Sequence, residues 1–532
     1  MSRQVRGVVE VAMPGCMVGG SYRQLRGGLH PTRLAPTMAA VAEATDRPRA
    51  KGVARRDSRS MIERRPSSLL AARIFLLSLG ALLVGYMFLG RGFAHVGVPP
   101  IYVGEVVLVI GLVCTTIVLV RTWPPRQPSI VVWLLVAFMA LGALRTIPYL
   151  GTYGVDALRD AVLWGYGVFA LMLYVILDRD VIGRAIRAYG WVVPAFAVWL
   201  PISWTVFRIV SSAIDPTRPG EVVPLVFFKS GDMTVHIVGA IAFLVIVPIF
   251  MTRFTFWWRV LFSVPMMWTL LAAGTSSRAA MVAAAFGVAA IVFVARNRRW
   301  QPVMIAGVVA ILIFAVPAAP VGVVLPTPAP TPTTSEATPT PRPTPAPSPV
   351  VVEPSPSRRQ VEVGQLFDNL VSILGSTSNA ALDGPRAFRL AWWSSIVDYT
   401  VFGEYFWTGK GFGLNLANDD GFQPTADQSM RAPHNSHMSI LARMGVPGFV
   451  LWLLLQIGFF VALVRAIFRH RRGGDAVLAA AGALVLVYWV AIMINTSFDP
   501  YIEGPQGGIW FWAVFGLGLV IARLSPTRPA AV

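Results

Sequence analysis

The chain has 532 residues, of which 55% are hydrophobic and only 13% are charged, whereas about a quarter of the residues of a soluble globular domain are charged. This composition excludes an ordinary soluble protein and is typical of a polytopic membrane protein, because each helical crossing needs roughly 20 apolar residues. The formal net charge of +19 would indicate a nucleic-acid partner in a soluble protein, but here the arginines border apolar segments, and no nucleic acid is expected. The two cysteines, Cys16 and Cys114, give no disulfide framework.

Residues 1–68 form a polar segment that is rich in glycine and arginine and has no clear period. Its charged stretch is too long for a secretory signal peptide. We therefore expect a disordered, basic, cytoplasmic tail. Met61 begins the sequence MIERRPSSLLAARIF, which would also serve as the start of a membrane protein.

Twelve apolar segments follow, and each is predicted to be a transmembrane helix. Nine of them lie within 69–320 and three within 437–523. Their expected bounds are 69–89, 101–121, 130–147, 160–177, 187–208, 233–251, 256–273, 278–295, 302–320, 437–466, 476–495 and 507–523. The expected fold class is an all-α polytopic membrane protein with about twelve transmembrane helices.

The basic residues are concentrated in every second connection between these segments. Arginine-rich connections, among them RTWPPRQP and ARNRRW, follow the second, fourth, sixth, eighth and tenth segments. Arginine and lysine concentrate in cytoplasmic loops beside helix ends, so these connections are expected in the cytoplasm. Both termini, including a short tail at 524–532, are then predicted to be cytoplasmic.

One long external loop is expected at 321–436, between the ninth and tenth segments. Residues 321–360 are rich in proline and threonine, which favours extended polyproline II and cannot build a core, so this part is predicted to be a spacer. Residues 361–436 are predicted to be ordered and to carry active-site residues. Within them, FRLAWWSSIVDYTVF is expected to form an amphipathic helix on the membrane surface, and GKGFG at 409–413 a tight turn.

The segment RAPHNSHMSILARMGVPG places two of the chain's six histidines at the mouth of the tenth segment. His434 precedes Asn435 and Ser436, which are good helix N-caps, and the positive end of a helix disfavours a charged imidazolium. A neutral histidine can act as a general base; the alternative is a histidine that only caps the helix or contacts lipid headgroups. His437 is expected to be a packing residue, because HNSH lacks a zinc-binding pattern.

Three arginines are further candidates. Arg278 lies in GTSSRAAM, between the seventh and eighth segments, on the side where arginine is expected to be rare. Arg386 and Arg389 lie in GPRAFRLAWW, close to Trp392 and Trp393. Snorkelling, ion pairing or a surface helix on anionic lipid would also account for them. As functional groups, their guanidinium forks suit phosphate oxygens, which with a neutral histidine indicates glycosyl transfer from a lipid diphosphate sugar.

The spacing of these segments is a further observation. His434 and Asn435 are followed after nine residues by Gly445, and Gly448 follows in the order Gly-x-x-Gly. The segments TSSRAA, RLAWW and GKGFG precede this motif in that order. Together they resemble the O-antigen ligase/polymerase family of bacterial membrane proteins, over about residues 69–523. In this resemblance Asn435, Gly445 and Gly448 support the histidine motif.

The resemblance implies a glycosyltransferase of the GT-C type in the bacterial cytoplasmic (inner) membrane, with its active site on the external, periplasmic face. Its donor would be an undecaprenyl-diphosphate-linked glycan and its acceptor a hydroxyl on a glycan, lipid or protein. His434 would activate the acceptor, and Arg278 and Arg389 would hold the diphosphate, with Arg386 competing for the second place. The reaction would invert the anomeric carbon and need no metal or other cofactor. Ligation, repeat-unit polymerisation and protein glycosylation all stay open.

Two alternatives belong to other functional classes. A non-enzymatic transporter or flippase of a lipid-linked glycan would use the same arginines, and would be expected to have ionisable residues near the bilayer midplane; Glu105 is one candidate. A structural membrane protein would instead use the proline-rich loop to bind partners. Replacing His434 tests the first alternative, and deleting residues 326–350 tests the second.

Overall fold

The computed structural model describes residues 66–122, 128–210, 224–249, 251–294, 298–315, 366, 369, 380–424, 426 and 428–526, all within one compact unit, Ile62–Val532. The expected tail at 1–68 lies outside the described residues except for its last three, and the expected spacer at 321–360 lies outside them entirely. Of the short C-terminal tail, residues 527–532 also lie outside them.

The described residues form α-helices almost throughout. The helices are α1 (Pro66–Leu89), α2 (Arg91–Ala94), α3 (Val103–Thr122), α4 (Ile130–Thr146), α5 (Leu150–Tyr153), α6 (Val155–Gly165), α7 (Gly167–Ile176), α8 (Arg179–Val210), α9 (Ser230–Ile246), α10 (Phe256–Ser276), α11 (Arg278–Val294), α12 (Gln301–Ala315), α14 (Ala380–Val401), α15 (Leu416–Asp419), α16 (Ser436–Arg472), α17 (Ala476–Thr496) and α18 (Pro505–Arg523). Four short 3₁₀ helices lie at Ile147–Tyr149, Val247–Ile249, Arg298–Trp300 and Tyr501–Glu503.

Each of the twelve predicted membrane segments contains a helix. Nine helices of the described chain are long and apolar enough to cross a membrane, and α6 with α7, bent by 44°, would make a tenth. The helices α11 and α12 are apolar but shorter. These apolar segments form helices as predicted, because a helix in hydrocarbon satisfies its own backbone hydrogen bonds. The protein is a mostly helical polytopic membrane protein.

A two-stranded hairpin departs from the expected all-α chain within the described residues. Strands β1 (Gly97–Val98) and β2 (Ile101–Tyr102) pair antiparallel, with Gly97 opposite Tyr102. Pro99 and Pro100 form the turn between them. Proline cannot continue a helix interior, so the third helix begins only at Val103 and not at 101 as the apolar pattern suggested.

The centre of the bundle is α9. About 89% of its apolar window is buried, against 33% for α1, α3 and α4, and it contacts α10, α11 and α17. A helix that is apolar all round belongs in a core. The outer helices instead expose large apolar side chains, for example Leu77, Val120 and Ile130, each more than 70% exposed. In a membrane protein these side chains face lipid.

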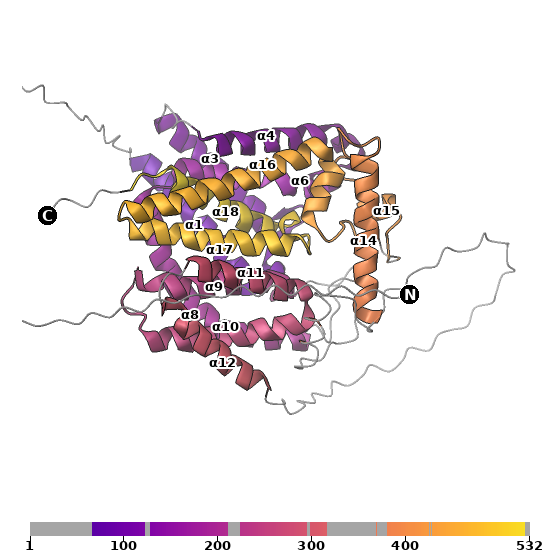
Figure 1. Ribbon diagram of the computed structural model, residues 1–532. Helices are drawn as coiled ribbons and strands as arrows, with labels where there is room; N and C mark the ends of the chain where they lie inside the picture. The colour runs from indigo at the N-terminus through magenta and orange to yellow at the C-terminus, as the bar shows by residue number, and fades with distance from the viewer. Residues whose placement is uncertain are drawn as a thin grey trace, which may run out of the picture. The chain divides into compact units, whose positions relative to one another are not determined.

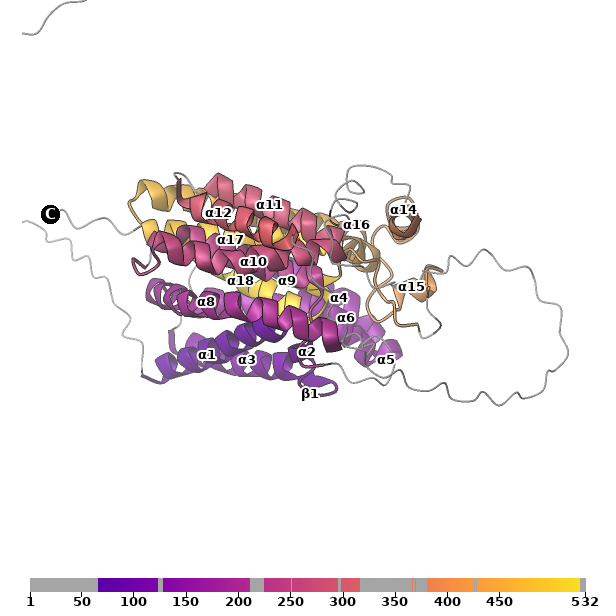
Figure 2. The ribbon, with the colours of Figure 1, turned by 90° about the horizontal axis from the view of Figure 1, so that it is seen from below.

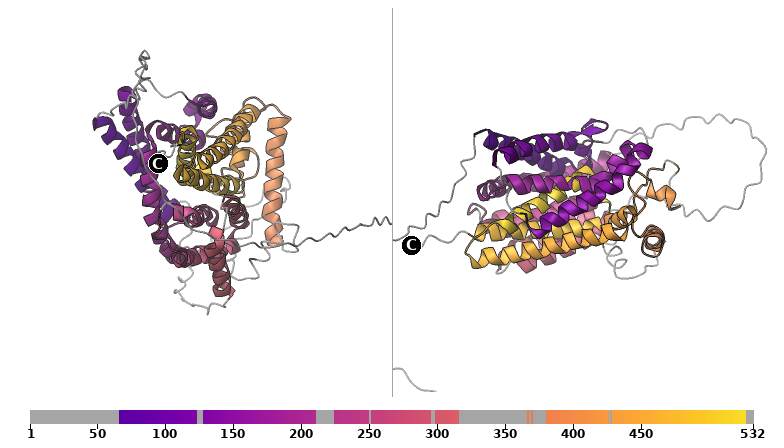
Figure 3. Two further views of the ribbon diagram at one scale, coloured as in Figure 1. Left: turned by 60° about the vertical axis from the view of Figure 1, so that its left-hand side comes forward. Right: turned by 90° about the horizontal axis from the view of Figure 1, so that it is seen from above.

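The helix α14 has a different orientation from the others. Figures 1 and 2 show the long helices running side by side, whereas α14 crosses their ends next to α15. The right-hand view in Figure 3 shows the orange segment that contains both helices at one end of the bundle. The helix expected from FRLAWWSSIVDYTVF is thus present, and its place on the membrane surface stays a prediction.

The helix α16 is not the single long span that the sequence suggested. Its backbone leaves helical geometry at Gly445, where φ is 66° and ψ is −171°. A short piece, beginning at Ser436, therefore changes direction before the long membrane piece starts. The break brings the start of α16 back to the end of the bundle that α14 crosses (Figure 1).

Candidate functional site

The site begins at the first turn of α16. Asn435 is the N-cap, and its side-chain oxygen accepts hydrogen bonds from the backbone N–H groups of His437 at 2.9 Å and Met438 at 3.3 Å. Such a cap satisfies donors that the helix cannot satisfy itself. His434 directly precedes the cap and has a φ of 53°, in the left-handed region that residues other than glycine rarely adopt. The cap therefore fixes the position at which the imidazole leaves the backbone.

The glycine stretch at 409–413 packs directly on the break in α16. Val446 donates its backbone N–H to the carbonyl of Phe406 at 2.8 Å. A Cβ added at Gly445 would lie 2.5 Å from the Phe406 oxygen, and one added at Gly409, where φ is 59°, would lie 2.4 Å from the Arg443 carbonyl carbon. Neither contact is compatible with a side chain. The two motifs, GKGFG and the glycines after the histidine, are thus one interlocked unit.

A buried ion cluster ties this unit to α6. The guanidinium of Arg443 is 2% exposed and lies 2.9 Å from Asp160. Arg431 reaches the same carboxylate at 3.3 Å and donates to the carbonyl of Gly413 at 2.9 Å. The backbone N–H of Gly413 also donates to Asp160 at 3.0 Å. A buried charge needs partners of this kind, so the cluster holds the glycine stretch against α6 and the start of α16.

A second ion cluster lies near the histidine. Arg91, at the start of α2, lies 2.6 Å from Asp232 in α9 and 2.9 Å from Asp499, which follows α17. Lys229, just before α9, lies 3.1 Å from the other oxygen of Asp499. The backbones of the two segments also meet in a bridge between Gly90 and Phe227. Helix ends that are far apart in the chain therefore converge beside His434.

Burial and these charges together set the protonation state of the histidine. Burial lowers the pKa of the His434 imidazole to about 4, and the positive charges of Arg389, Lys229 and Arg91 also lower it, while Asp499 acts in the opposite direction. The imidazole is consequently neutral at ordinary pH, as a general base must be. The pKa of Asp499 is itself lowered, because the nearby cations outweigh the effect of its burial.

The helix α14 brings one of the two predicted arginines, Arg389, close to His434. The indole N–H of Trp393 donates to the carbonyl of Pro433 at 2.8 Å, which joins α14 to the residue before the histidine. Arg389 lies one turn earlier on the same helix face, is partly buried, and is the strongest single charge acting on His434. Arg386 is exposed. The geometry thus favours Arg389 over Arg386.

The comparison with known families adds to this geometry. The family model described as O-Antigen ligase matches residues 261–453. These residues carry an O-antigen ligase domain. The resemblance to the O-antigen ligase/polymerase family is thereby confirmed, and the domain indicates a glycan ligase or polymerase that acts on lipid-linked glycan in the bacterial inner membrane. A search of the curated proteins finds no match.

The ligase domain contains every site residue expected from the sequence: Arg278, Arg386, Arg389, His434, Asn435, Gly445 and Gly448. Arg278 is the first residue of α11, and it is not among the charges that act most strongly on His434. Arg91, Lys229 and Asp499 lie outside the domain and were missed from the sequence. The sequence offered one signal for them, because Arg91 and Lys229 are basic residues on the expected external side of the membrane.

His437, the second histidine of the ligase domain, contacts neighbouring side chains through both nitrogens of its ring. The indole N–H of Trp452 donates to His437 Nδ1 at 3.1 Å, and His437 Nε2 lies 3.1 Å from the Ser497 hydroxyl. Both ring nitrogens are therefore engaged. Among the described residues, no three His, Cys, Asp or Glu side chains are grouped as metal ligands would be.

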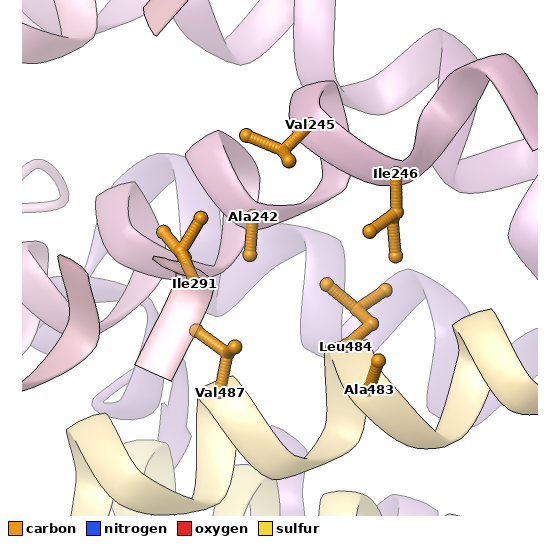
Figure 4. Close-up of a pocket in the computed structure, with 7 residues that line it drawn as sticks. All are labelled: Ala242, Val245, Ile246, Ile291, Ala483, Leu484 and Val487. Atoms are coloured by element: carbon orange, nitrogen blue, oxygen red, sulfur yellow. The ribbon is translucent and has the colours of Figure 1, made fainter. Parts of the chain in front are cut away.

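A small recess elsewhere in the bundle is lined by apolar side chains. Figure 4 shows its lining, which comes from α9, α11 and α17 and consists of Ala242, Val245, Ile246, Ile291, Ala483, Leu484 and Val487. All seven side chains are apolar, so this recess is part of the helix packing and not of the site.

Proposed function

We propose that the protein transfers a glycan from an undecaprenyl-diphosphate-linked donor to an acceptor hydroxyl, with His434 as the general base. The observation that carries this proposal is a neutral imidazole, fixed by a capped helix start, beside the cations Arg389 and Lys229. In the proposed step, His434 accepts the proton of the acceptor hydroxyl as its oxygen bonds to the anomeric carbon. The bond from that carbon to the diphosphate breaks, and its electron pair leaves with the phosphate oxygen. Displacement in one step inverts the anomeric carbon.

The leaving diphosphate requires positive charge, which arginine can provide. We assign this role to Arg389 and Arg278, whose guanidinium forks can each bind two phosphate oxygens. Charge stabilisation of this kind needs no metal ion, and we propose a metal-independent reaction. Arg386 is the alternative second arginine, and its exposed position argues against it.

The low pKa of His434 fits this role only together with the bound donor. A free base with a pKa of about 4 accepts a proton weakly. A diphosphate held by Arg389 would offset the positive charges that lower the pKa and so would raise it, while the larger effect of burial remains. The base would then gain strength when the donor is in place, and it would remain unprotonated in the free enzyme.

The proposed topology has twelve crossings, with both termini in the cytoplasm and the site on the external face. It takes α6 with α7 as one crossing and counts the shorter α11 and α12 as two more. The support is the alternation of arginine-rich connections and the helix α14 across the bundle's end (Figure 2). In this arrangement the long external loop lies between the ninth and tenth crossings.

The proposal is tested with purified protein in liposomes, supplied with an undecaprenyl-diphosphate-linked glycan and a hydroxyl acceptor. His434→Ala should lower transfer by roughly 10²–10⁴-fold. Arg389→Gln should also impair transfer, whereas the matched variant Arg386→Gln should retain it. Normal transfer by His434→Ala would refute the base assignment. Movement of the donor across the membrane without transfer would support a transporter instead.

Analysis of the cell envelope distinguishes the reaction types. In a deletion strain that carries His434→Ala, long chains left on the carrier lipid would indicate a ligase. Single repeat units left there would indicate a polymerase. Addition of a chelator should leave transfer unchanged, and a strict need for a divalent ion would contradict the metal-independent mechanism.

A further inference from the structure

The end of the bundle opposite His434 carries a second cationic surface. Lys229, at the start of α9, lies in the ion cluster beside His434. The 17-residue helix then leads away from it to the connection that contains Arg253. The helices α8, α10 and α12 pack together here. Two contacts define it: Arg253 stacks on Trp191, and Arg259 bonds to the backbone of Arg299. Together with Arg187 and Trp257, which are close to these residues in the sequence, we call them the arginine–tryptophan face.

The arginines of this face are held in defined positions. The guanidinium of Arg253 lies 3.6 Å from the centre of the Trp191 ring and donates to the carbonyl of Gly190 at 3.3 Å. Arg259 donates to the backbone carbonyl of Arg299 at 3.2 Å. The Nε of Arg259 is buried and has no hydrogen-bond partner within the described residues. An arginine has five N–H donors, so these contacts leave donors available for a ligand.

No carboxylate of the neighbouring sequence balances these charges. Residues 233–335, which include α10, α11 and α12, contain no Asp or Glu. On α8, Asp180 lies two turns before Arg187, and the oxygen of Asp178 caps the N–H of Val181 at 2.9 Å. Within the part of the chain that the structure describes, none of the arginines of this face forms an ion pair, whereas Arg179 pairs with Asp475. Unpaired arginines produce a positive potential that attracts an anion.

The tryptophans indicate the depth of this face in the membrane. Trp191 is 69% exposed and Trp257 is 71% exposed. Indole rings on a membrane protein favour the boundary between lipid headgroups and hydrocarbon. An arginine stacked on such a ring, as Arg253 is on Trp191, therefore lies at the depth of the lipid phosphates. This depth is wrong for a soluble anion and suitable for a phospholipid.

We propose that the arginine–tryptophan face binds an anionic phospholipid, with the headgroup phosphate against Arg253, Arg259 and Arg299 and the acyl chains along the indoles. The inner leaflet carries the anionic lipids, and this face lies in it under the topology proposed above. Binding itself does not depend on that topology or on the transferase activity. The site is distinct from that of the lipid-linked donor at the other end of the bundle.

The test measures lipid binding and not glycan transfer, so its failure and that of the proposed function are distinguishable. Cardiolipin or phosphatidylglycerol is titrated into purified protein in detergent, and bound lipid is counted by native mass spectrometry. The triple variant Arg253→Gln, Arg259→Gln, Arg299→Gln should bind about tenfold or more weakly than wild type, since each lost bond to a charged group is worth about a factor of ten.

A charge-matched control replaces three exposed arginines at the same end of the bundle: Arg121→Gln, Arg465→Gln and Arg472→Gln. This control should bind as wild type does. Equal weakening in the control, or equal binding of phosphatidylethanolamine, would overturn the proposal. Displacement of the lipid by millimolar inorganic phosphate would also overturn it, because the face would then be a soluble anion site. If the triple variant is not monodisperse, Arg299→Gln alone must show the loss.

Discussion

Replacing Gly445 by alanine tests whether the break in α16 builds the site. The backbone there has φ 66° and ψ −171°, a region that costs a residue other than glycine about 1–3 kcal/mol. The new Cβ would also lie 2.5 Å from the carbonyl oxygen of Phe406 and 2.9 Å from the backbone nitrogen of Gly409. Both neighbours are backbone atoms and cannot rotate away, so the GKGFG stretch must move, at a further cost of about 1–3 kcal/mol.

The expected result is a free energy of unfolding lower by about 2–6 kcal/mol, together with a loss of glycan transfer. The matched control is Gly80→Ala in α1, where nothing lies within 4 Å of the added Cβ. That change should stabilise the helix by about 1 kcal/mol and leave transfer unchanged. Thermal unfolding in detergent and transfer in liposomes provide the two measurements. If Gly445→Ala unfolds at the same temperature as Gly80→Ala, the contact between Gly445 and the GKGFG stretch does not stabilise the break in α16.

Three other outcomes are expected. The acid limb of kcat/KM should lie near pH 4, because His434 is neutral above its lowered pKa of about 4; a limb near pH 6.5 would contradict this environment. Between these values the unfolded histidine binds a proton that the folded one does not, so the His434 contribution to stability should fall as pH falls. Arg443→Ala should destabilise the fold by about 3–5 kcal/mol, because it removes a partner of the buried Asp160; thermal unfolding unchanged from wild type would show that Arg431 suffices. Trp393→Phe removes the bond to the Pro433 carbonyl and should lower transfer more than stability, and unchanged transfer would show that α14 does not position the histidine.

The local chemistry of the chain was enough to predict its helices and one of its caps. Each apolar segment became a helix because hydrocarbon leaves no other partner for the backbone. The N-cap at Asn435 also follows from residue type, since its side chain can accept from the first turn wherever that helix packs. The motif around His434 led to the family resemblance that the comparison confirms over residues 261–453.

Other features depended on contacts between distant parts of the chain. The apolar pattern of α16 continues through Gly445, and only the approach of the GKGFG stretch explains the break. Arg91 meets Asp499 across 408 positions of sequence and Asp232 across 141. Such pairings cannot be predicted from the local periodicity of the sequence, because they form only where the ends of distant helices converge. The sequence by itself determined the helices and the histidine motif, and tertiary packing decided how deeply that histidine is buried and which charges surround it, and so its pKa.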